Sequence, residues 1–384
     1  MSSLRLLLPF TLVATTACFN PTDTQGATAT EGTGSSSGTS TSASATTAET
    51  SAEGSTTATT TASTTADSSA SEGSTMGDSS MGGSSGDVPG CTAPELLGSY
   101  PTASQTLAVA VWGTRAYATH TNAGLIILDL ADPTNPTQIA ALPLPNPSAV
   151  AVLGDDVYVG DPTGLFHIDA ATTSLAGSIP GPGGRAVGGV AVVDGTVYFT
   201  DNANGDTCDA CGLHIIDSEL TAEQGMLALG EDPRGVAVEG DYAFVADGLG
   251  GLVVVDVSDP SSPTLAIQVL VDGWASGVSV GDGRVFVAHG GVTMFDVTQP
   301  TMPAQLTTLA GTSVFATSIA GNWLWLSDQD PGLRVVDVGD PAAPVELGAL
   351  ADFTAGAGVA TNEDLAVVGS YEHGVRVVAQ PVCG

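Results

Sequence analysis

Short apolar runs separated by Gly- and Asp-containing turns fill residues 91–384, and this pattern repeats roughly every 40 residues. The clearest copies begin at Gly124, Gly251, Gly291 and Gly332, and the best two read GLVVVDVSDPSSP and GLRVVDVGDPAAP. Weaker copies are GLFHID at 164–169, GLHIID at 212–217 and GVRVVA at 374–379. The positions that end the apolar runs are Asp129, Asp169, Asp217, Asp256, Asp296, Asp337 and Ala379, with spacings of 40, 48, 39, 40, 41 and 42 residues. The motif therefore occurs seven times.

Each copy carries the signals of four strands. In the fourth copy, two apolar runs flank a Gly-Asp turn at 235–247, which is typical of a hairpin. The run at 251–256 indicates a third strand, and residues 264–270 indicate a fourth. No copy shows the 3.6-residue apolar period of a helix. The pattern predicts an all-β fold, a seven-bladed β-propeller with four-stranded blades.

The two ends of the repeat region complement each other. The seventh copy stops after its third strand, while residues 94–100 (PELLGSY) align without a gap with the fourth strand at 344–350 (PVELGAL). We therefore expect the N-terminal strand to complete the last blade and close the ring, which removes open strand edges. In this alignment Cys91 and Cys383 both map onto the position of Pro341. This predicts a Cys91–Cys383 disulfide.

The other cysteines have separate interpretations. Cys208 and Cys211 lie in an insertion with no flanking helix, which favours a loop disulfide. Metal or redox chemistry is the alternative, although only His214 is close enough to add a ligand. Cys18 follows a short apolar run after Arg5, and Thr15 to Cys18 resembles a bacterial lipoprotein box. We expect residues 1–18 to be a signal peptide and Cys18 to be lipidated, with an ordinary secretory signal as the alternative.

Residues 19–90 have the composition of a disordered linker. Ser, Thr, Gly and Ala make up 52 of the 60 residues between Ala27 and Gly86, which leaves too little apolar bulk to offset the entropy of folding. The predicted organisation is a signal peptide at 1–18, a linker at 19–90 and a propeller at 91–384. A lipid-anchored head on a long tether suits display on the outer membrane or the cell surface.

Charge limits the partners. The chain carries 41 acidic and 7 basic residues and a net charge of −34, which argues against nucleic acid and anionic lipid surfaces as ligands. The strings GLVVVDVSDPSSP and GLRVVDVGDPAAP resemble the LVIVD repeat of bacterial and archaeal cell-surface proteins. This resemblance covers about residues 94–379 and implies a propeller outside the cell, and the family has no general catalytic residues to transfer.

Polar side chains recur at the turn between the second and third strand of each copy. They are His120, Asp161, Asp201, Asp247, His289, Asp328 and the group Tyr371, Glu372 and His373. Such a ring is able to hold a cation or accept protons, but recurrence in every copy favours carboxylates that simply bond their own turns. The stretch 202–206 has oxygen ligands at alternate positions and makes calcium an alternative there; no other cofactor is expected.

Aromatic side chains in the loops between copies suggest a binding face. They are Tyr100, Trp274, Phe315 and Phe353, and with His120, His289 and His373 they form the predicted ligand face. Packing over the channel mouth is the alternative for Trp274. We expect a monomeric, non-catalytic recognition or scaffold lipoprotein that binds a protein or glycan. A hydrolase or lyase on the propeller face and a calcium-dependent binding module are the alternatives.

Overall fold

The computed structural model describes residues 90–202, 208, 210–351, 353 and 356–383. The predicted signal peptide, almost all of the predicted linker and most of the calcium candidate stretch at 202–206 lie outside the described residues. Within them, a single short 3₁₀ helix, η1 (Pro182–Gly184), accompanies 27 β-strands. The all-β fold class is confirmed.

Four antiparallel sheets each contain four consecutive strands. The first is β2 (Thr106–Trp112), β3 (Arg115–His120), β4 (Gly124–Asp129) and β5 (Thr137–Leu142). The second is β6 (Ala149–Leu153), β7 (Asp156–Asp161), β8 (Gly164–Asp169) and β9 (Ser174–Pro180). The third is β10 (Ala186–Val193), β11 (Thr196–Asn202), β12 (Gly212–Asp217) and β13 (Glu223–Ala228). The fourth is β14 (Pro233–Glu239), β15 (Tyr242–Asp247), β16 (Leu252–Asp256) and β17 (Thr264–Val269).

A fifth sheet has seven strands because one long strand belongs to two repeats. It contains β18 (Gly277–Gly281), β19 (Arg284–Ala288), β20 (Gly290–Asp296), β21 (Ala304–Ala320), β22 (Trp323–Asp328), β23 (Leu333–Asp337) and β24 (Val345–Leu350). The first half of β21 pairs with β20, with Leu309 opposite Val292, and its second half pairs with β22, with Ala320 opposite Trp323. Each half of this sheet therefore repeats the four-stranded arrangement of the others.

The sixth sheet joins the two ends of the described chain. It contains β25 (Gly356–Thr361), β26 (Leu365–Ser370), β27 (Gly374–Ala379) and β1 (Leu96–Tyr100). Strand β1 lies antiparallel to β27, with Tyr100 opposite Val375. The predicted disulfide between Cys91 and Cys383 is present just outside this pair. The predicted pairing of the N-terminal strand with the last copy is confirmed.

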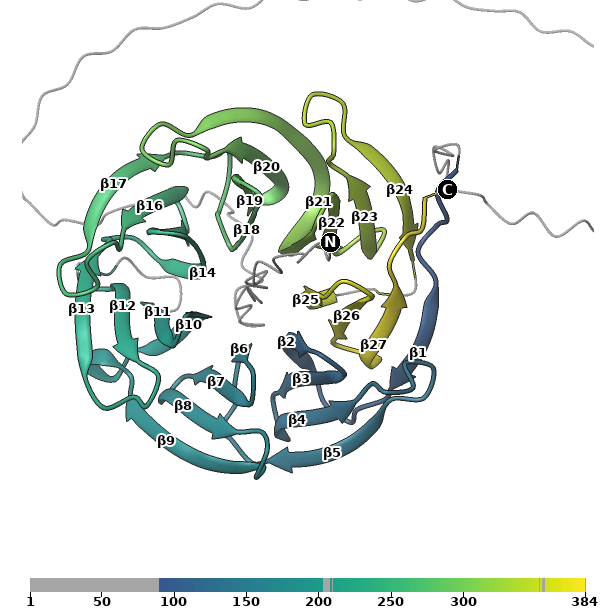
Figure 1. Cartoon of the computed structure of the whole chain (residues 1–384), viewed down its shortest axis with the longest axis horizontal. Helices are drawn as coiled ribbons and strands as arrows, with labels where there is room; N and C mark the ends of the chain where they lie inside the picture. Colours follow the sequence, from purple (N-terminus) through teal and green to yellow (C-terminus); the bar gives the residue numbers. More distant parts are fainter. Residues whose placement is uncertain (1–89, 203–207, 209, 352, 354–355, 384) are drawn as a thin grey trace, which may run out of the picture. The chain divides into compact units, whose positions relative to one another are not determined.

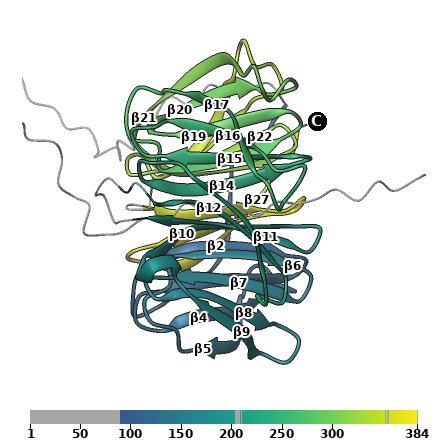
Figure 2. The same cartoon turned by 90° about the vertical axis from the view of Figure 1, so that its left-hand side faces the viewer.

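The sheets follow one another around a common centre, with β2, β6, β10, β14, β18 and β25 innermost (Figure 1). From β2 to β18 these strands contact each other in sequence order, β21 contacts both β18 and β25, and β25 contacts β2. Seen from the side, the strands run across the thickness of the molecule, so the turns gather at its two faces (Figure 2). This arrangement is β-propeller-like.

Face-to-face stacking explains the nearly continuous apolar runs of the sequence. In β16, the four residues from Leu252 to Val255 are all buried because both faces of its sheet are covered. Each apolar cluster is shared between neighbouring sheets; one contains Phe244 of β15 and Phe295 of β20. Trp325 is fully buried, as its position along β22 predicts. The outermost strands consist mainly of exposed and half-buried residues because only one of their faces is covered.

Candidate functional site

The aspartates that end the third strands are turn anchors. Asp129 accepts a hydrogen bond from the backbone N–H of Ala131 at 2.9 Å, and Asp256 accepts one from Ser258 at 3.0 Å. The equivalent bonds involve Asp169 with Ala171, Asp217 with Ala222, Asp296 with Thr298 and Asp337 with Gly339. These carboxylates replace missing backbone partners of their turns, so they provide no distinct acid and base groups for catalysis.

Most aspartates at the turn between second and third strands also have local partners. Asp161 accepts hydrogen bonds from the backbone N–H groups of Thr163 at 2.5 Å and Gly164 at 3.0 Å. Asp201 accepts a hydrogen bond from the backbone N–H of Gly212 at 2.8 Å and one from Arg185 Nε at 2.5 Å. The interpretation of these positions as turn anchors fits both.

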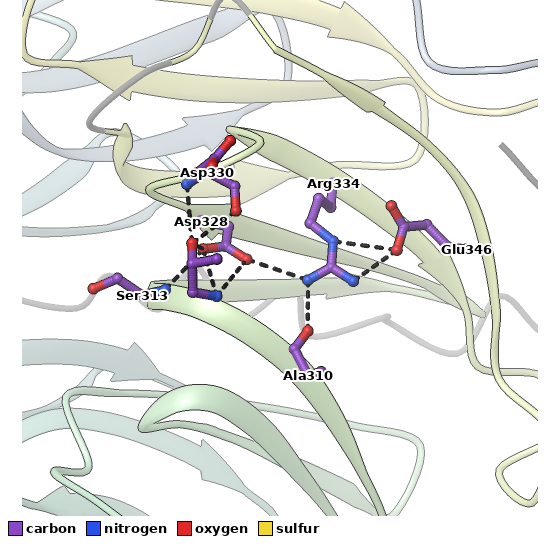
Figure 3. Close-up of polar contacts among 7 residues, drawn as sticks. Ala310, Ser313, Asp328, Asp330, Arg334 and Glu346 are labelled. Atoms are coloured by element: carbon purple, nitrogen blue, oxygen red, sulfur yellow. Dashed lines mark hydrogen bonds and ion pairs between the residues drawn. The ribbon is translucent and has the colours of Figure 1, made fainter. Parts of the chain in front are cut away.

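Asp328 shows how a buried carboxylate at this turn is satisfied (Figure 3). Its side chain is 1% exposed and lies 3.2 Å from Nη1 of Arg334. Arg334 reaches Glu346 through Nη2 at 2.6 Å and donates to the carbonyl of Ala310 at 2.7 Å. Thr312 and Ser313 complete the shell with backbone N–H donors, and Thr312 adds its hydroxyl at 2.8 Å.

Asp247 departs from this pattern. It is 0% exposed, yet neither carboxylate oxygen accepts a hydrogen bond. Burial, with the negative charges of Glu231 and Asp232 adding to it, raises the pKa of Asp247 to about 7. The expectation that Asp247 bonds its own turn is therefore wrong. Its turn, Gly248-Leu-Gly-Gly251, directs the N–H of Gly250 to the backbone carbonyl of Asp247 instead.

The histidines of the predicted face lie in different surroundings. His120 is fully buried and contacts the hydroxyl of Thr106 through Nδ1 at 3.2 Å. Burial lowers the pKa of His120 to about 4, so the ring is neutral at physiological pH. His289 is half-buried between the carbonyl of Asp272 and the hydroxyl of Thr293, each at 2.8 Å. His120 therefore does not present its ring on a ligand face, because the innermost strands cover it.

No group of three or more His, Cys, Asp or Glu side chains in the described ranges is placed to hold a metal ion. The calcium candidate at 202–206 lies mostly outside those ranges. Cys208 and Cys211 form a disulfide, as predicted. His214, the only residue that seemed able to add a ligand there, instead lies between Asp201 at 3.1 Å and Glu223 at 2.7 Å.

Of the predicted face aromatics, only Trp274 is strongly exposed, at 38%. Tyr100 and Phe315 are half-buried. Phe353 is only 1% exposed, so its predicted place on an open face is wrong. It packs against Leu333 and Leu350 in an apolar cluster, and the guanidinium of Arg376 lies 4.5 Å from its ring centre.

Trp274 belongs to an exposed apolar patch that sequence reasoning missed. Leu249 and Leu270 are 64% and 73% exposed, and with Trp274 they form what we term the Trp274 patch. The backbones of Gly248 and Ala275 bond reciprocally at 3.1 and 2.9 Å, joining the β15–β16 turn to the β17–β18 loop. A Cβ on Gly248 would lie 3.2 Å from the Trp274 ring. The signal available in the sequence was Leu249, a large apolar residue that stands between Gly248 and Gly250 in a turn rather than in a strand.

The surroundings of the Trp274 patch are mainly acidic. Glu231 and Asp232 lie in the β13–β14 loop, and exposed Asp272 lies beside Trp274 in the chain. Arg234 pairs with Asp232 at 2.6 Å, and its guanidinium lies 5.7 Å from the Trp274 ring centre. The patch thus combines apolar area with negative potential, and its own arginine is already engaged.

A pocket of about 440 Å³ lies where β1 leads into β2. Its lining is Tyr100, Pro101, Thr102, Ala103, Ser104, Asn122, Ala123 and Ile126. None of these side chains is charged, which is unusual in so acidic a chain. The Tyr100 hydroxyl donates to Gln138 at 2.6 Å and so fixes the ring at the pocket wall. Such a lining suits a neutral ligand with hydroxyl or amide groups.

Comparisons with known proteins support the fold. The LVIVD repeat model matches residues 104–141, 231–271 and 314–352. The chain is similar to the structure of U3-55K, with 10% identity and a TM-score of 0.59 over 75% of this chain and 98% of that one. It is also similar to the computationally designed Ika8 protein, with 12% identity and a TM-score of 0.56 over 74% and 99% of the two chains. No curated protein matches. At these low sequence identities, the similarity to solved structures supports the fold alone.

Among the described residues, no helix has both the length and the apolar character needed to span a membrane.

Proposed function

We propose that the described residues form a closed propeller of seven blades. The seven-stranded sheet then counts as two blades that share β21, and β1 supplies the outer strand of the last blade. Two observations support this: each half of β21 pairs with a different strand, and innermost strand β25 contacts β2. The seven copies of the motif in the sequence agree with this count.

The propeller is proposed to be displayed on the outer membrane or cell surface as a monomeric lipoprotein anchored at Cys18, with residues 19–90 as its tether. The lipoprotein-like residues before Cys18 and the LVIVD matches support this proposal. Fractionation of cells after metabolic labelling with a fatty-acid analogue tests it. Wild-type protein should carry label and remain with membranes, while Cys18→Ala should lose both properties.

The proposed function is non-catalytic recognition of a protein partner through the Trp274 patch. The observation that carries it is the gathering of three exposed large apolar side chains on two loops joined by the Gly248–Ala275 bridge. Exposed apolar area of this kind marks interaction sites. Because Glu231 and exposed Asp272 lie beside it, the complementary partner presents basic side chains around an apolar contact.

Crosslinking on intact cells tests this proposal. A photoreactive amino acid replaces Leu249 or Leu270, and in the control variant it replaces Leu265, which is 54% exposed on the outermost strand β17. We expect one partner to crosslink at positions 249 and 270 but not at 265, and Trp274→Ala to weaken that crosslink at least severalfold. Equal crosslinking at all three positions would show that the patch is not a specific surface.

The uncharged pocket beside Tyr100 favours a second candidate function, binding of a neutral glycan. An aromatic wall with hydroxyl and amide side chains around it is the chemistry that recognises sugars. Saturation-transfer NMR with methyl glycosides tests this function. Transfer should be lost in Asn122→Ala and retained in Trp274→Ala, because Asn122 lines the pocket and Trp274 does not.

A further inference from the structure

Asp247 occupies a position that recurs in every proposed blade: the residue that ends the second strand and faces the start of the third. The equivalents are His120, Asp161, Asp201, His289, Asp328 and Ser370. All six have hydrogen-bond partners in the structure. Asp247 has none for either carboxylate oxygen, although it is fully buried. Buried polar groups are normally satisfied, so this exception calls for a physical explanation.

Strand register shows how the surroundings of Asp247 differ from those of Asp328. Asp328 faces Val314, and Asp247 faces Pro233, so the donors Thr312 and Ser313 correspond to Glu231 and Asp232. Two residues before each aspartate, Leu326 faces Arg334 and Val245 faces Val253. Arg334 therefore corresponds to Val253, which is 2% exposed. In the blade of Asp247, Glu231 and Val253 stand where the blade of Asp328 has the Thr312 hydroxyl and the Arg334 guanidinium.

The groups packed around Asp247 leave it only the backbone N–H of Asp232 as a weak donor, and this contact does not reach hydrogen-bond geometry. Asp232 binds Arg234 through Oδ2, and that guanidinium also lies over Trp274. On β17, the side-chain amide of Gln268 donates to the carbonyl of Gly250 at 2.9 Å. In the next blade, His289 contacts Asp272 and Thr293. The remaining charged neighbours, Glu231 and Asp232, repel an ionised Asp247.

Asp247 also adjoins the contact that holds the Trp274 patch in place. The next residue, Gly248, forms the reciprocal bonds to Ala275 and packs against the Trp274 ring. A buried anion without a donor favours any local opening that hydrates it. The Gly248–Ala275 bridge is the contact next to Asp247 whose opening would admit water.

We propose that Asp247 is a proton-operated latch: its protonated form keeps the Gly248–Ala275 bridge closed, and its ionised form loosens the bridge and frees the Trp274 patch. The latch would regulate the surface of the proposed function and to that extent rests on it. The physical switch itself belongs to this chain alone, so it is testable without any partner.

The direction of the pH effect follows from proton linkage. The carboxyl pKa is about 7 in the closed state and about 3.8, its ordinary value, once hydrated. Between these values the opened state binds fewer protons than the closed state. The equilibrium constant for opening therefore increases about tenfold per pH unit from about pH 4 to about pH 7. Above pH 7 both states are ionised, and opening stays level.

Amide hydrogen exchange at Gly248 and Ala275, corrected for intrinsic rates, measures this opening. Wild-type exchange should accelerate by about tenfold per unit between pH 4.5 and 7. Asp247→Asn, which mimics the protonated form, should give a flat profile. Asp161→Asn at the equivalent position serves as the control and should keep the wild-type profile. A wild-type profile that is flat, or a rise that persists in Asp247→Asn, would overturn the latch.

A second variant guards against misfolding of Asp247→Asn. Glu231→Gln removes one like charge near Asp247 and keeps the side-chain shape. The pH at which exchange levels off should then move down, while the slope below it stays the same. An unchanged levelling pH would contradict the assignment to Asp247. Loss of partner crosslinking with an intact exchange profile would instead count against the proposed function and leave the latch standing.

Discussion

At the scale of single residues, neighbours decide what a buried aspartate does. Asp328, Asp201 and Asp247 are all fully buried or nearly so at equivalent turns. An arginine and backbone N–H donors contact both Asp328 and Asp201, and for Asp201 its hydrogen bonds outweigh burial and lower the pKa of the carboxyl. Asp247 has no such partner, and its burial, with the negative charges of Glu231 and Asp232 adding to it, raises its pKa to about 7. Asp201 and Asp247 are the same residue type, and the donors and charges around each decide the direction in which its pKa shifts.

His214 gives a further pH-dependent contribution to stability. Burial lowers the pKa of His214, but hydrogen bonds to Asp201 and Glu223 outweigh burial, so its net pKa is raised. The folded state therefore binds its proton more tightly than the unfolded chain does, and the stabilisation is fully present below about pH 6.5. We predict that the stability advantage of wild type over His214→Gln shrinks as pH rises through the folded pKa. Urea denaturation at pH 6 and pH 9 measures it; a constant difference would contradict the prediction.

The sequence shows which residues stand at turns but not which donors surround them. Asp161 and Asp328 were predicted to bond the backbone of their own Gly-containing turns; Asp161 does, whereas Asp328 accepts its backbone hydrogen bonds from Thr312 and Ser313 on β21. Asp247 has the same signature, and its difference arises from Glu231 and Val253, which only strand register brings to it. Likewise, Phe353 sits in a loop, yet side chains distant in sequence bury it.

At the scale of elements, an ion network ties three strands of one sheet together. Arg334 of β23 links Asp328 of β22 to Glu346 of β24 (Figure 3). Replacing Arg334 by Leu leaves Asp328 buried without its counter-charge, which costs about 3 kcal/mol of unfolding free energy. The matched control is Arg115→Leu, since Arg115 pairs with exposed Asp155 at 3.4 Å and such surface pairs contribute about 0–1 kcal/mol. Equal losses in urea denaturation would refute the role of the network.

Two turn glycines allow the cost of an unfavourable backbone conformation to be measured separately from the cost of a steric clash. Gly124 and Gly113 lie in the same sheet with φ of +80° and +55°. A Cβ on Gly124 would collide with the backbone of Leu142, whereas nothing lies within 4 Å of one on Gly113. We predict that Gly113→Ala costs about 1 kcal/mol from strain alone, and that Gly124→Ala costs clearly more. Thermal unfolding of the two variants compares them, and a smaller loss for Gly124→Ala would contradict this reasoning.

The strands themselves were largely predictable because each apolar run is short and bounded by Gly or Asp. The predicted strands at 251–256 and 264–270 correspond to β16 and β17 within one residue. The fusion of two repeats through β21 was not predicted. Its 17 residues include Gly311 and Thr312, which normally indicate a break. Pairing with a different strand on each half keeps the backbone extended across them.

At the scale of the whole molecule, the many negative charges repel one another, while the two ends of the described chain are held together by few contacts. The net charge of −34 opposes compaction at low ionic strength. The two ends of the described chain meet only in the last sheet, where β1 pairs with β27. A terminal strand held by hydrogen bonds alone would fray, since chain ends open at the lowest free-energy cost. The Cys91–Cys383 disulfide lies where that fraying would begin.

The two disulfides therefore make a matched test of ring closure. Cys91 and Cys383 are 292 residues apart, whereas Cys208 and Cys211 are three apart. If the bond mainly restricts the unfolded chain, replacing Cys91 and Cys383 by Ala costs about 3–5 kcal/mol, and replacing the short-range pair costs about 2 kcal/mol. Urea denaturation of the two double variants measures both losses, and hydrogen exchange of the β1 amides reports where opening starts. Because closure is local to β1, its amides should lose protection first in the Cys91/Cys383 variant and keep it in the Cys208/Cys211 variant. If both double variants lost the same unfolding free energy and the β1 amides kept their protection from exchange, β1 would stay paired without the Cys91–Cys383 disulfide. The disulfide would then not secure the ring.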